Sequence, residues 1–234
     1  MRRRLALVIV LVNVMALTPA PLFAQGVKLH WGTQIGVNLA QASYESEFFD
    51  HVDNKYSPGF IGGGTLVMSF PGQQMFSIES GLFFQMKGGK TEIKMLGTDT
   101  EGNLTGVFRD ERRWKLNYLT VPLLVRASLY TGGLQPYVKA GPEFGILVSS
   151  KYERHSETPG QSPSPTTEID MKDWSNSTDL ALLFGAGLQF ETGSAAFFAE
   201  LSYSHSLTDV WETRNVSNET LKNRVVGLSA GVRF

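Results

Sequence analysis

The sequence predicts an all-β protein: an eight-stranded antiparallel up-and-down transmembrane β-barrel, preceded by a cleaved signal peptide. Three observations predict this class: an export signal, segments in which apolar residues alternate with small or polar ones, and connections that alternate between long and short. Side chains of a strand point alternately to opposite faces, so the alternation gives one apolar and one polar face. A membrane barrel needs the apolar face outward, towards lipid.

The N-terminus has the three parts of a secretory signal. Three arginines follow Met1, residues 5–17 are apolar apart from Asn13, and a short segment ends in Leu-Phe-Ala at Ala24. The alternative is a transmembrane anchor, but roughly 13 apolar residues are too few to cross a bilayer. We therefore expect a signal peptide at residues 1–24 and a barrel domain at residues 25–234.

Composition excludes several classes of protein. Without the three N-terminal arginines, 18 of the 21 basic residues remain against 22 acidic ones, a charge of about −4. A weakly acidic exported chain has no electrostatic footprint for nucleic acid. The absence of cysteine excludes a disulfide framework, a thiolate metal site and a lipid anchor on Cys. After the signal, no stretch approaches about 18 consecutive apolar residues, so no membrane helix is expected.

The first three strands are expected at residues 29–39, 58–70 and 76–87, each with apolar residues at alternate positions. A run of three glycines, 62–64, interrupts the second strand. Glycine inside a strand favours a bend or a close approach of another backbone. The segment Pro-Gly-Gln-Gln at residues 71–74 predicts a compact turn between the second and third strands.

The fourth and fifth strands are expected at residues 114–129 and 136–148, with a turn around residues 130–133. Pro122 falls inside the fourth strand. Because proline cannot donate a backbone hydrogen bond, this position is either the weakest point of the pattern or a bulge.

The last three strands are expected at residues 178–191, 195–207 and 224–234, with a tight turn at residues 192–194 between the first two. The final segment is expected to be the strand that closes the barrel. Its apolar face carries Val226, Leu228, Ala230, Val232 and Phe234.

The connections alternate in length along the whole chain. The long ones are expected as irregular loops at residues 40–57, 88–113, 149–176 and 208–223, and the others take only a few residues. Outer-membrane barrels have short periplasmic turns and long outer loops, whereas a soluble sandwich has no reason to segregate loop length. We therefore expect the outer membrane of a Gram-negative bacterium, with four long extracellular loops.

The polar faces of the strands predict a charge network inside the barrel. An eight-stranded barrel is just wide enough for its own side chains to fill it. A lone buried charge is costly, so oppositely charged residues are expected to neutralise one another there. This predicts a closed interior, with a narrow pore as the alternative. The network residues are Glu79, Lys87, Arg126, Lys139, Glu143, Glu200 and Arg233.

Aromatic residues gather near the strand ends and predict two girdles at the membrane interfaces. The alternative is that aromatic residues are simply common in strands. The tryptophans fall at the long-loop ends and the other residues at the short-turn ends. The girdle residues are Phe70, Phe76, Trp114, Tyr130, Trp174, Phe190, Phe197, Trp211 and Phe234.

Two adjacent segments carry a family resemblance. Residues 118–124, Tyr-Leu-Thr-Val-Pro-Leu-Leu, and residues 137–142, Tyr-Val-Lys-Ala-Gly-Pro, resemble consecutive strands of the outer-membrane β-barrel family abundant in Bacteroidetes, often called PorT-like. That family carries a proline at the place of Pro122. The resemblance implies an eight-stranded barrel, and one branch of the family serves a gliding-associated secretion system.

No catalytic, cofactor or metal site is expected. Glu200, Ser204, Ser206 and His205 raise the question of a lipid deacylase, but His205 has the opposite parity and points away from the others. Metalloprotease, nucleophile-elbow and phosphate-loop motifs are absent, and the four histidines are scattered.

These patterns together predict a non-enzymatic integral outer-membrane protein with a side-chain-filled interior and four loops for structural or interaction roles. The alternative is a barrel component of a PorT-like secretion or envelope-assembly machine. A lipid-modifying enzyme and a narrow pore are less favoured. The partners expected are outer-membrane lipid, the barrel-assembly machinery during insertion, and an extracellular or envelope protein at the loops; nucleic acid is not expected.

Overall fold

The computed structural model describes residues 26–45, 53–73, 75–98, 104–129, 133–157, 166–172, 175–210 and 220–234. The expected signal peptide at residues 1–24 lies outside these ranges. Within them the regular structure is almost entirely β, and no helix is long and apolar enough to cross a bilayer. The strands are β1 (Lys28–Glu45), β2 (Asp53–Lys55), β3 (Ser57–Ser69), β4 (Phe76–Thr98), β5 (Leu104–Ser128), β6 (Leu134–Glu157), β7 (Thr167–Asp170), β8 (Thr178–Thr192), β9 (Ala195–Ser206) and β10 (Thr220–Arg233).

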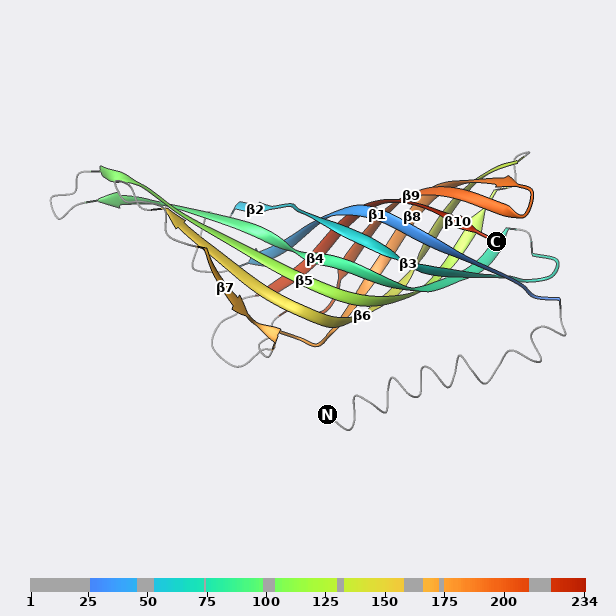
Figure 1. The fold of residues 1–234 in the computed structure, drawn as a ribbon, viewed down its shortest axis with the longest axis horizontal. Helices are drawn as coiled ribbons and strands as arrows, with labels where there is room; N and C mark the ends of the chain where they lie inside the picture. Colours follow the sequence, from blue (N-terminus) through green and yellow to red (C-terminus); the bar gives the residue numbers. More distant parts are fainter. Residues whose placement is uncertain are drawn as a thin grey trace, which may run out of the picture.

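Eight long strands close into a barrel in which each strand pairs antiparallel with its neighbours in sequence (Figure 1). The order is β1, β3, β4, β5, β6, β8, β9 and β10, and β10 returns to pair with β1. β2 and β7 are short additions that pair with β4 and β6. Closure leaves the long strands without a free edge within the barrel wall. The predicted eight-stranded antiparallel barrel is confirmed.

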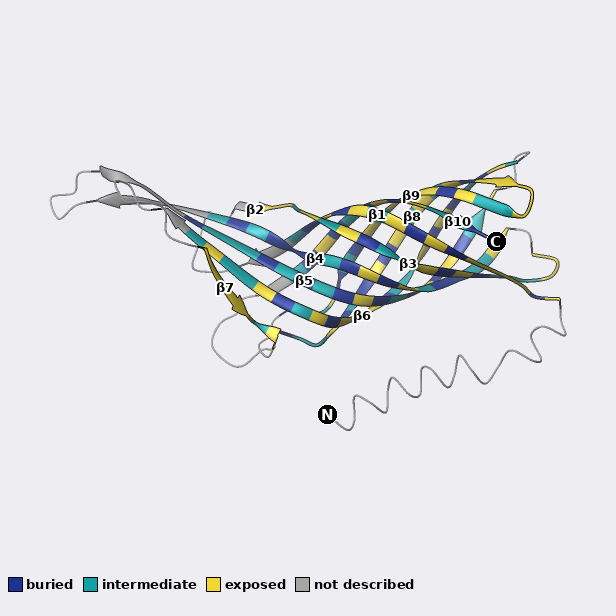
Figure 2. Cartoon of the chain, in the orientation of Figure 1, coloured by how far each residue is buried: buried dark blue, intermediate teal, exposed yellow. Residues whose placement is uncertain are grey.

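Burial alternates along the strands as the sequence pattern predicts (Figure 2). Leu123 and Leu182 on the apolar parity are 52% and 39% exposed on the outer wall. Lys139 and Glu143 on the other parity are 6% and 2% exposed. The protein therefore reverses the arrangement of a soluble domain, with apolar side chains outside and charged ones inside.

The three short connections, between β3 and β4, β5 and β6, and β8 and β9, fall where the sequence predicts them. Gly72 and Gly193 each take a positive φ, +76° and +58°, as does Gly133 at +99° beside the β5–β6 turn. Glycine adopts this left-handed conformation without a Cβ clash, which is why it is favoured at such turns.

The predicted irregular loop at residues 88–113 is wrong. β4 and β5 continue as one antiparallel ladder as far as the pair Gly97 and Gly106, and β6 continues beside β5 as far as Glu157. Figure 1 shows this three-stranded extension, here called the ribbon, running well beyond the other strands. Outside the barrel wall a strand can pair its backbone without the apolar alternation that contact with lipid imposes.

The other long connections also contain more strand than predicted. β1 continues to Glu45 and β2 lies within the expected loop at 40–57. β7 lies within the loop at 149–176, and β10 begins at Thr220, inside the loop at 208–223. As in the ribbon, backbone pairing extends these strands where the sequence shows no alternation.

Pro122 lies within β5 without a bulge against β4. The paired residues Ser80–Leu123 and Phe83–Thr120 keep the same register on either side of it, and only the intervening pairs are missing. The hydroxyl of Ser80 donates a hydrogen bond to the Pro122 carbonyl oxygen at 2.7 Å. The register shift in β5 lies elsewhere, between Asn117 and Tyr118.

The glycine run in β3 marks a close backbone approach, as the sequence predicts. A Cβ on Gly63 would collide with the carbonyl oxygen of Leu82 and lie 2.7 Å from the Cα of Phe83 on β4. A Cβ on the next residue, Gly64, would find its nearest atom 3.8 Å away. Only the inward position of this pair therefore requires glycine.

We predict that Gly63→Ala destabilises the barrel by about 1–3 kcal/mol, because the β3 and β4 backbones must separate to admit the methyl group. Urea unfolding of the refolded barrel in detergent measures the loss. Gly64→Ala is the matched control and is expected to unfold like the unmodified chain. Equal stability of the two variants would contradict the close approach.

Candidate functional site: the charged barrel interior

All seven charged residues expected inside the barrel are buried, each with an exposed fraction of 6% or less. Five of the eight long strands contribute them, so residues far apart in sequence meet across the interior. β4 supplies Glu79 and Lys87, β5 Arg126, β6 Lys139 and Glu143, β9 Glu200 and β10 Arg233.

Glu79 is the centre of the larger group of charges, near the short-turn end. Its Oε1 accepts a hydrogen bond from Lys139 Nζ at 2.5 Å, and its Oε2 accepts one from Arg233 Nη2 at 2.9 Å. Arg126 Nη1 lies 3.5 Å from the same Oε2. One carboxylate therefore serves three cations, which come from three different strands.

A second carboxylate completes this group, which we call the Glu79 cluster. Glu200 Oε2 lies 2.7 Å from Lys139 Nζ and accepts a hydrogen bond from Tyr137 Oη at 3.0 Å. The Arg126 guanidinium lies 3.7 Å from the centroid of the Tyr137 ring, within cation–π distance. The Glu79 cluster consists of Glu79, Arg126, Lys139, Glu200 and Arg233.

A separate group, the Lys87 cluster, lies towards the long-loop end. Lys87 Nζ donates to Glu143 Oε1 at 2.9 Å and to Asp179 Oδ2 at 3.0 Å. The Ser204 hydroxyl donates to Glu143 at 3.1 Å, and the Ser206 hydroxyl donates to Asp179 at 3.0 Å. Each buried carboxylate is thus held by a cation and a hydroxyl, the compensation that burial of charge requires.

Asp179 is the interior charge that the sequence analysis missed. It is 5% exposed on β8, and with it the two clusters hold four cations and four carboxylates. The signal was available, since Asp179 has the opposite parity from the apolar residues of residues 178–191 and therefore faces inward. Asp179 is the second residue of β8 and follows a polar connection, so the strand pattern is weak at this position.

The interior and β9 show no Ser-His-acid arrangement among the described residues. Ser204 and Ser206 donate to interior carboxylates, whereas His205 is half-buried on the opposite face, with its ring 6.4 Å from that of Tyr203. The sequence expectation that parity separates the histidine from the serines agrees with this geometry. No group of three His, Asp or Glu side chains in the described ranges could hold a metal ion.

The expected girdle residues fall into three groups. Phe76, Phe190, Phe197 and Phe234 are exposed on the outer wall at the short-turn end, and Phe70 is half-buried there. Tyr130, Trp174 and Trp211 lie outside the described residues.

Trp114 is a correction to the expected girdle. It is 7% exposed and packs beside Tyr152, with ring centroids 5.7 Å apart. Its parity is that of Leu116 and Tyr118, which are buried within the barrel, so β5 directs its side chain inward. A position near the end of a strand does not decide whether a side chain faces lipid or the interior. The parity of the residue decides it.

The closing strand joins the two ends of the barrel sheet. Phe234 and Trp31 exchange both backbone hydrogen bonds, at 2.8 and 3.2 Å, and their rings lie 5.1 Å apart. On the apolar face of β10, Leu228 and Ala230 are exposed, while Val226 and Val232 are half-buried.

Ion pairs also hold the ribbon, outside the barrel. Arg154 Nε donates to Asp110 Oδ1 at 2.8 Å, and Arg112 Nε donates to Asp110 Oδ2 at 3.1 Å. Burial alone would raise the pKa of the Asp110 carboxyl, but the two arginines outweigh it and the pKa is lowered. Lys115 pairs with Glu153 at 2.5 Å, across the same two strands. The Asp110–Arg154 and Lys115–Glu153 pairs tie β5 to β6.

We predict that Asp179→Asn lowers the free energy of unfolding by about 1–3 kcal/mol, because Lys87, Ser206 and Thr208 lose the buried carboxylate that accepts their hydrogen bonds. Urea titration of the refolded barrel measures the change. Asp209→Asn is the matched control, since no ion pair involves Asp209 in the described part of the chain. If both variants unfold at the same urea concentration, the Asp179 carboxylate is not what stabilises this cluster.

Solved structures that align with the chain include Neisserial surface protein A, 16% identical over 87% of this chain and 95% of that chain, with a TM-score of 0.41. OprG from Pseudomonas aeruginosa is 10% identical over 88% and 95%, with a TM-score of 0.42. Ail from Yersinia pestis, in complex with the heparin analogue sucrose octasulfate, is 14% identical over 88% and 99%, with a TM-score of 0.36.

Sequence comparison gives the family. No curated protein matches the chain at a significant level. The sequence profile described as "Outer membrane protein beta-barrel domain" matches residues 23–212, most of the chain. With the closed eight-stranded barrel, the apolar outer wall and the charged interior, this match identifies the protein: it belongs to the outer membrane protein beta-barrel domain family and is an outer-membrane β-barrel.

Proposed function

We propose that this barrel is a non-enzymatic integral outer-membrane protein with a closed interior, which presents its ribbon outside the membrane for interaction with an extracellular or envelope protein. The observation that carries the closed interior is the complete pairing of four buried cations with four buried carboxylates. An aqueous channel would hydrate these groups, so they would not need direct partners.

The width of the barrel supports the same conclusion. Eight strands enclose a space that side chains fill, and here arginine, lysine and tyrosine side chains reach across it to partners on other strands. The absence of a Ser-His-acid arrangement on β9 supports a non-enzymatic role over lipid modification.

The ribbon supports an interaction role. It carries the pairing of β4, β5 and β6 well past the barrel and is fixed by ion pairs, so it offers a preformed surface rather than a loop that must fold on binding. Outer-membrane barrels place their long connections on the extracellular side, so the ribbon is proposed to face outward from the cell. Lipid of the outer membrane and the assembly machinery that inserts the barrel are the other partners proposed.

The alternative is a barrel component of a PorT-like secretion or envelope-assembly machine. Residues 118–124 and 137–142, which carry that resemblance, lie on the paired strands β5 and β6, with Pro122 opposite Glu143. The resemblance thus maps to one side of the barrel, which includes a residue of the Lys87 cluster. In this alternative the barrel itself, rather than the ribbon, contacts the other components.

We predict no steady conductance when the purified barrel is inserted into a planar lipid bilayer, because the paired side chains block the interior.

Glu79→Gln leaves Arg126, Lys139 and Arg233 without their shared carboxylate and is expected to lower the free energy of unfolding by about 3 kcal/mol. Urea unfolding measures that decrease.

Glu92→Gln is the matched control for this substitution, because the partner of Glu92, Lys55, is well exposed and the pair lies outside the barrel. The double variant Glu79→Gln/Arg126→Gln restores the charge balance and should recover part of the stability. Stepwise, long-lived currents through the unmodified protein would contradict the closed interior.

The β4 and β5 parts of the ribbon can be removed without opening the barrel, because Gly89 and Trp114 face each other as a cross-strand pair. We predict that replacing residues 90–113 with Asn-Gly, a two-residue hairpin turn, preserves the folded barrel and abolishes capture of a partner from detergent-solubilised membranes. Heat-modifiable migration on a gel checks folding. A partner captured equally well without the ribbon would favour the alternative, in which the barrel makes the contact.

A further inference from the structure

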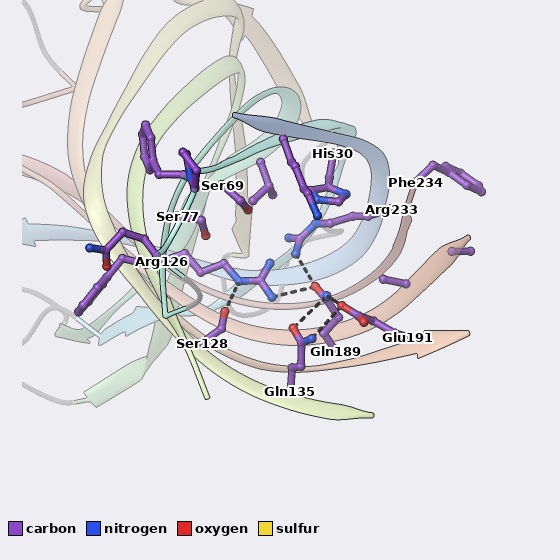
Figure 3. A pocket seen from close by; sticks show the side chains of 18 of the residues that line it. His30, Ser69, Ser77, Arg126, Ser128, Gln135, Gln189, Glu191, Arg233 and Phe234 are labelled. Atoms are coloured by element: carbon purple, nitrogen blue, oxygen red, sulfur yellow. Dashed lines mark hydrogen bonds between the residues drawn. The ribbon is translucent and has the colours of Figure 1, made fainter. Parts of the chain in front are cut away.

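A cavity of about 850 Å³ opens into the barrel at its short-turn end (Figure 3). Its wall includes the turn between β3 and β4, the start of β1 and the end of β10. The charged and amide side chains that line it include Lys28, His30, Arg126, Gln189, Glu191 and Arg233. This volume lies within the range of pockets that bind small molecules. It is separate from the ribbon, which leaves the opposite end of the barrel.

The interior charge is balanced as a whole but not along the barrel axis. The Glu79 cluster, next to the cavity, has three cations and two carboxylates. The Lys87 cluster, towards the other end, has one cation and two carboxylates. One excess positive charge therefore lies at the short-turn end and one excess negative charge at the long-loop end. The asymmetry directs positive potential into the cavity.

Two guanidinium groups from this cluster form part of the cavity wall and share one neutral acceptor. Arg126 Nη2 and Arg233 Nη1 both donate to Gln189 Oε1, at 2.8 and 3.0 Å (Figure 3). Arg233 Nε is buried and has no hydrogen-bond partner among the described residues. An uncharged amide oxygen stands where an anionic oxygen would make stronger, charge-assisted bonds to both arginines.

The remaining charged groups of the wall do not cancel this excess. Glu191 Oε1 accepts hydrogen bonds from Gln135 Nε2 at 2.8 Å and from Gln189 Nε2 at 3.4 Å, so amides rather than arginines hold it. Lys28 is exposed on the wall. Among the side chains of the wall, Lys28 and Glu191 offset each other, so the one excess positive charge of the Glu79 cluster remains.

We propose that this cavity binds a small water-soluble anion with carboxylate or phosphate groups, entering from the short-turn side. Arg126 and Arg233 hold the anionic group, because paired guanidinium forks match carboxylate and phosphate oxygens. Gln189 holds the two forks together until the anion displaces its amide oxygen, and Lys28 attracts the anion at the opening. In this family of barrels the short turns face the periplasm, so the ligand comes from that compartment.

The test uses the mature full-length chain, refolded in a detergent with a neutral sugar headgroup, at pH 7 and low salt. Isothermal titration calorimetry with inorganic phosphate and with citrate measures binding. Saturable binding to one site that weakens as salt is added is expected. Gln189→Glu places a carboxylate between the two arginines, so it should abolish anion binding while raising or preserving the urea midpoint. Retained binding in this folded variant would overturn the proposal.

A matched pair of lysines locates the site. Lys28→Gln, at the cavity, should weaken binding about fivefold, the effect of losing one charge at partly screened distance. Lys55→Gln, at the ribbon end of the barrel, should leave the Kd unchanged. Equal effects of the two substitutions would place the anion elsewhere and overturn the proposal.

A second arm distinguishes a soluble anion from a lipid headgroup. Short-chain phosphatidylglycerol is titrated in place of phosphate under the same conditions. Binding of phosphate or citrate that Gln189→Glu abolishes supports the soluble ligand. Saturable binding of the lipid, with no binding of either free anion, would assign the cavity to a headgroup and overturn the proposal.

Discussion

The structure depends on the mutual neutralisation of charges inside a barrel too narrow for bulk water. Membrane insertion fixes the outer wall as apolar, and the strict alternation of a strand then sends every other side chain inward. Some of those side chains are charged, and burial makes each of them costly unless a partner is within reach. Glu79 meets this requirement with three cations from three strands, so the same contacts that pay for burial also tie the barrel wall together across its centre.

The two ends of the barrel differ because they meet different surroundings. At the short-turn end, three tight turns leave a cavity whose wall carries an excess of positive charge. At the other end, β4, β5 and β6 continue past the barrel as a ribbon, where ion pairs such as Asp110 with Arg154 hold the strands together. In the proposed function and the further inference, these two ends are separate recognition surfaces: the ribbon for a protein and the cavity for an anion.

Predictions from the sequence were correct where they used the parity of a strand, and wrong where parity was not used or where the sequence shows no alternation. The parity of Leu123 and Lys139 follows from neighbours in the same strand, and their faces were predicted correctly. Trp114 was assigned to the outer wall from its position at a strand end, although its parity directs it inward. Residues 88–113 are predicted as a loop because their polar sequence lacks alternation, yet backbones can pair without alternation outside the barrel wall. Asp179 was omitted although its parity was visible.

The sequence by itself determined the number of barrel strands, their turns and the face that each side chain occupies, because a strand has a period of two and a bilayer admits only an apolar outer wall. Only the tertiary structure decided which inward groups meet: that Lys139 bridges Glu79 and Glu200, that Lys87 pairs with Asp179, and that Arg126 and Arg233 converge on Gln189. In sequence, Lys139 and Glu79 are 60 residues apart, and Lys87 and Asp179 are 92 residues apart. The stagger of the strands around the closed barrel sets how deep each inward side chain lies, and therefore which partners it reaches. Closure of eight strands is a property of the whole chain.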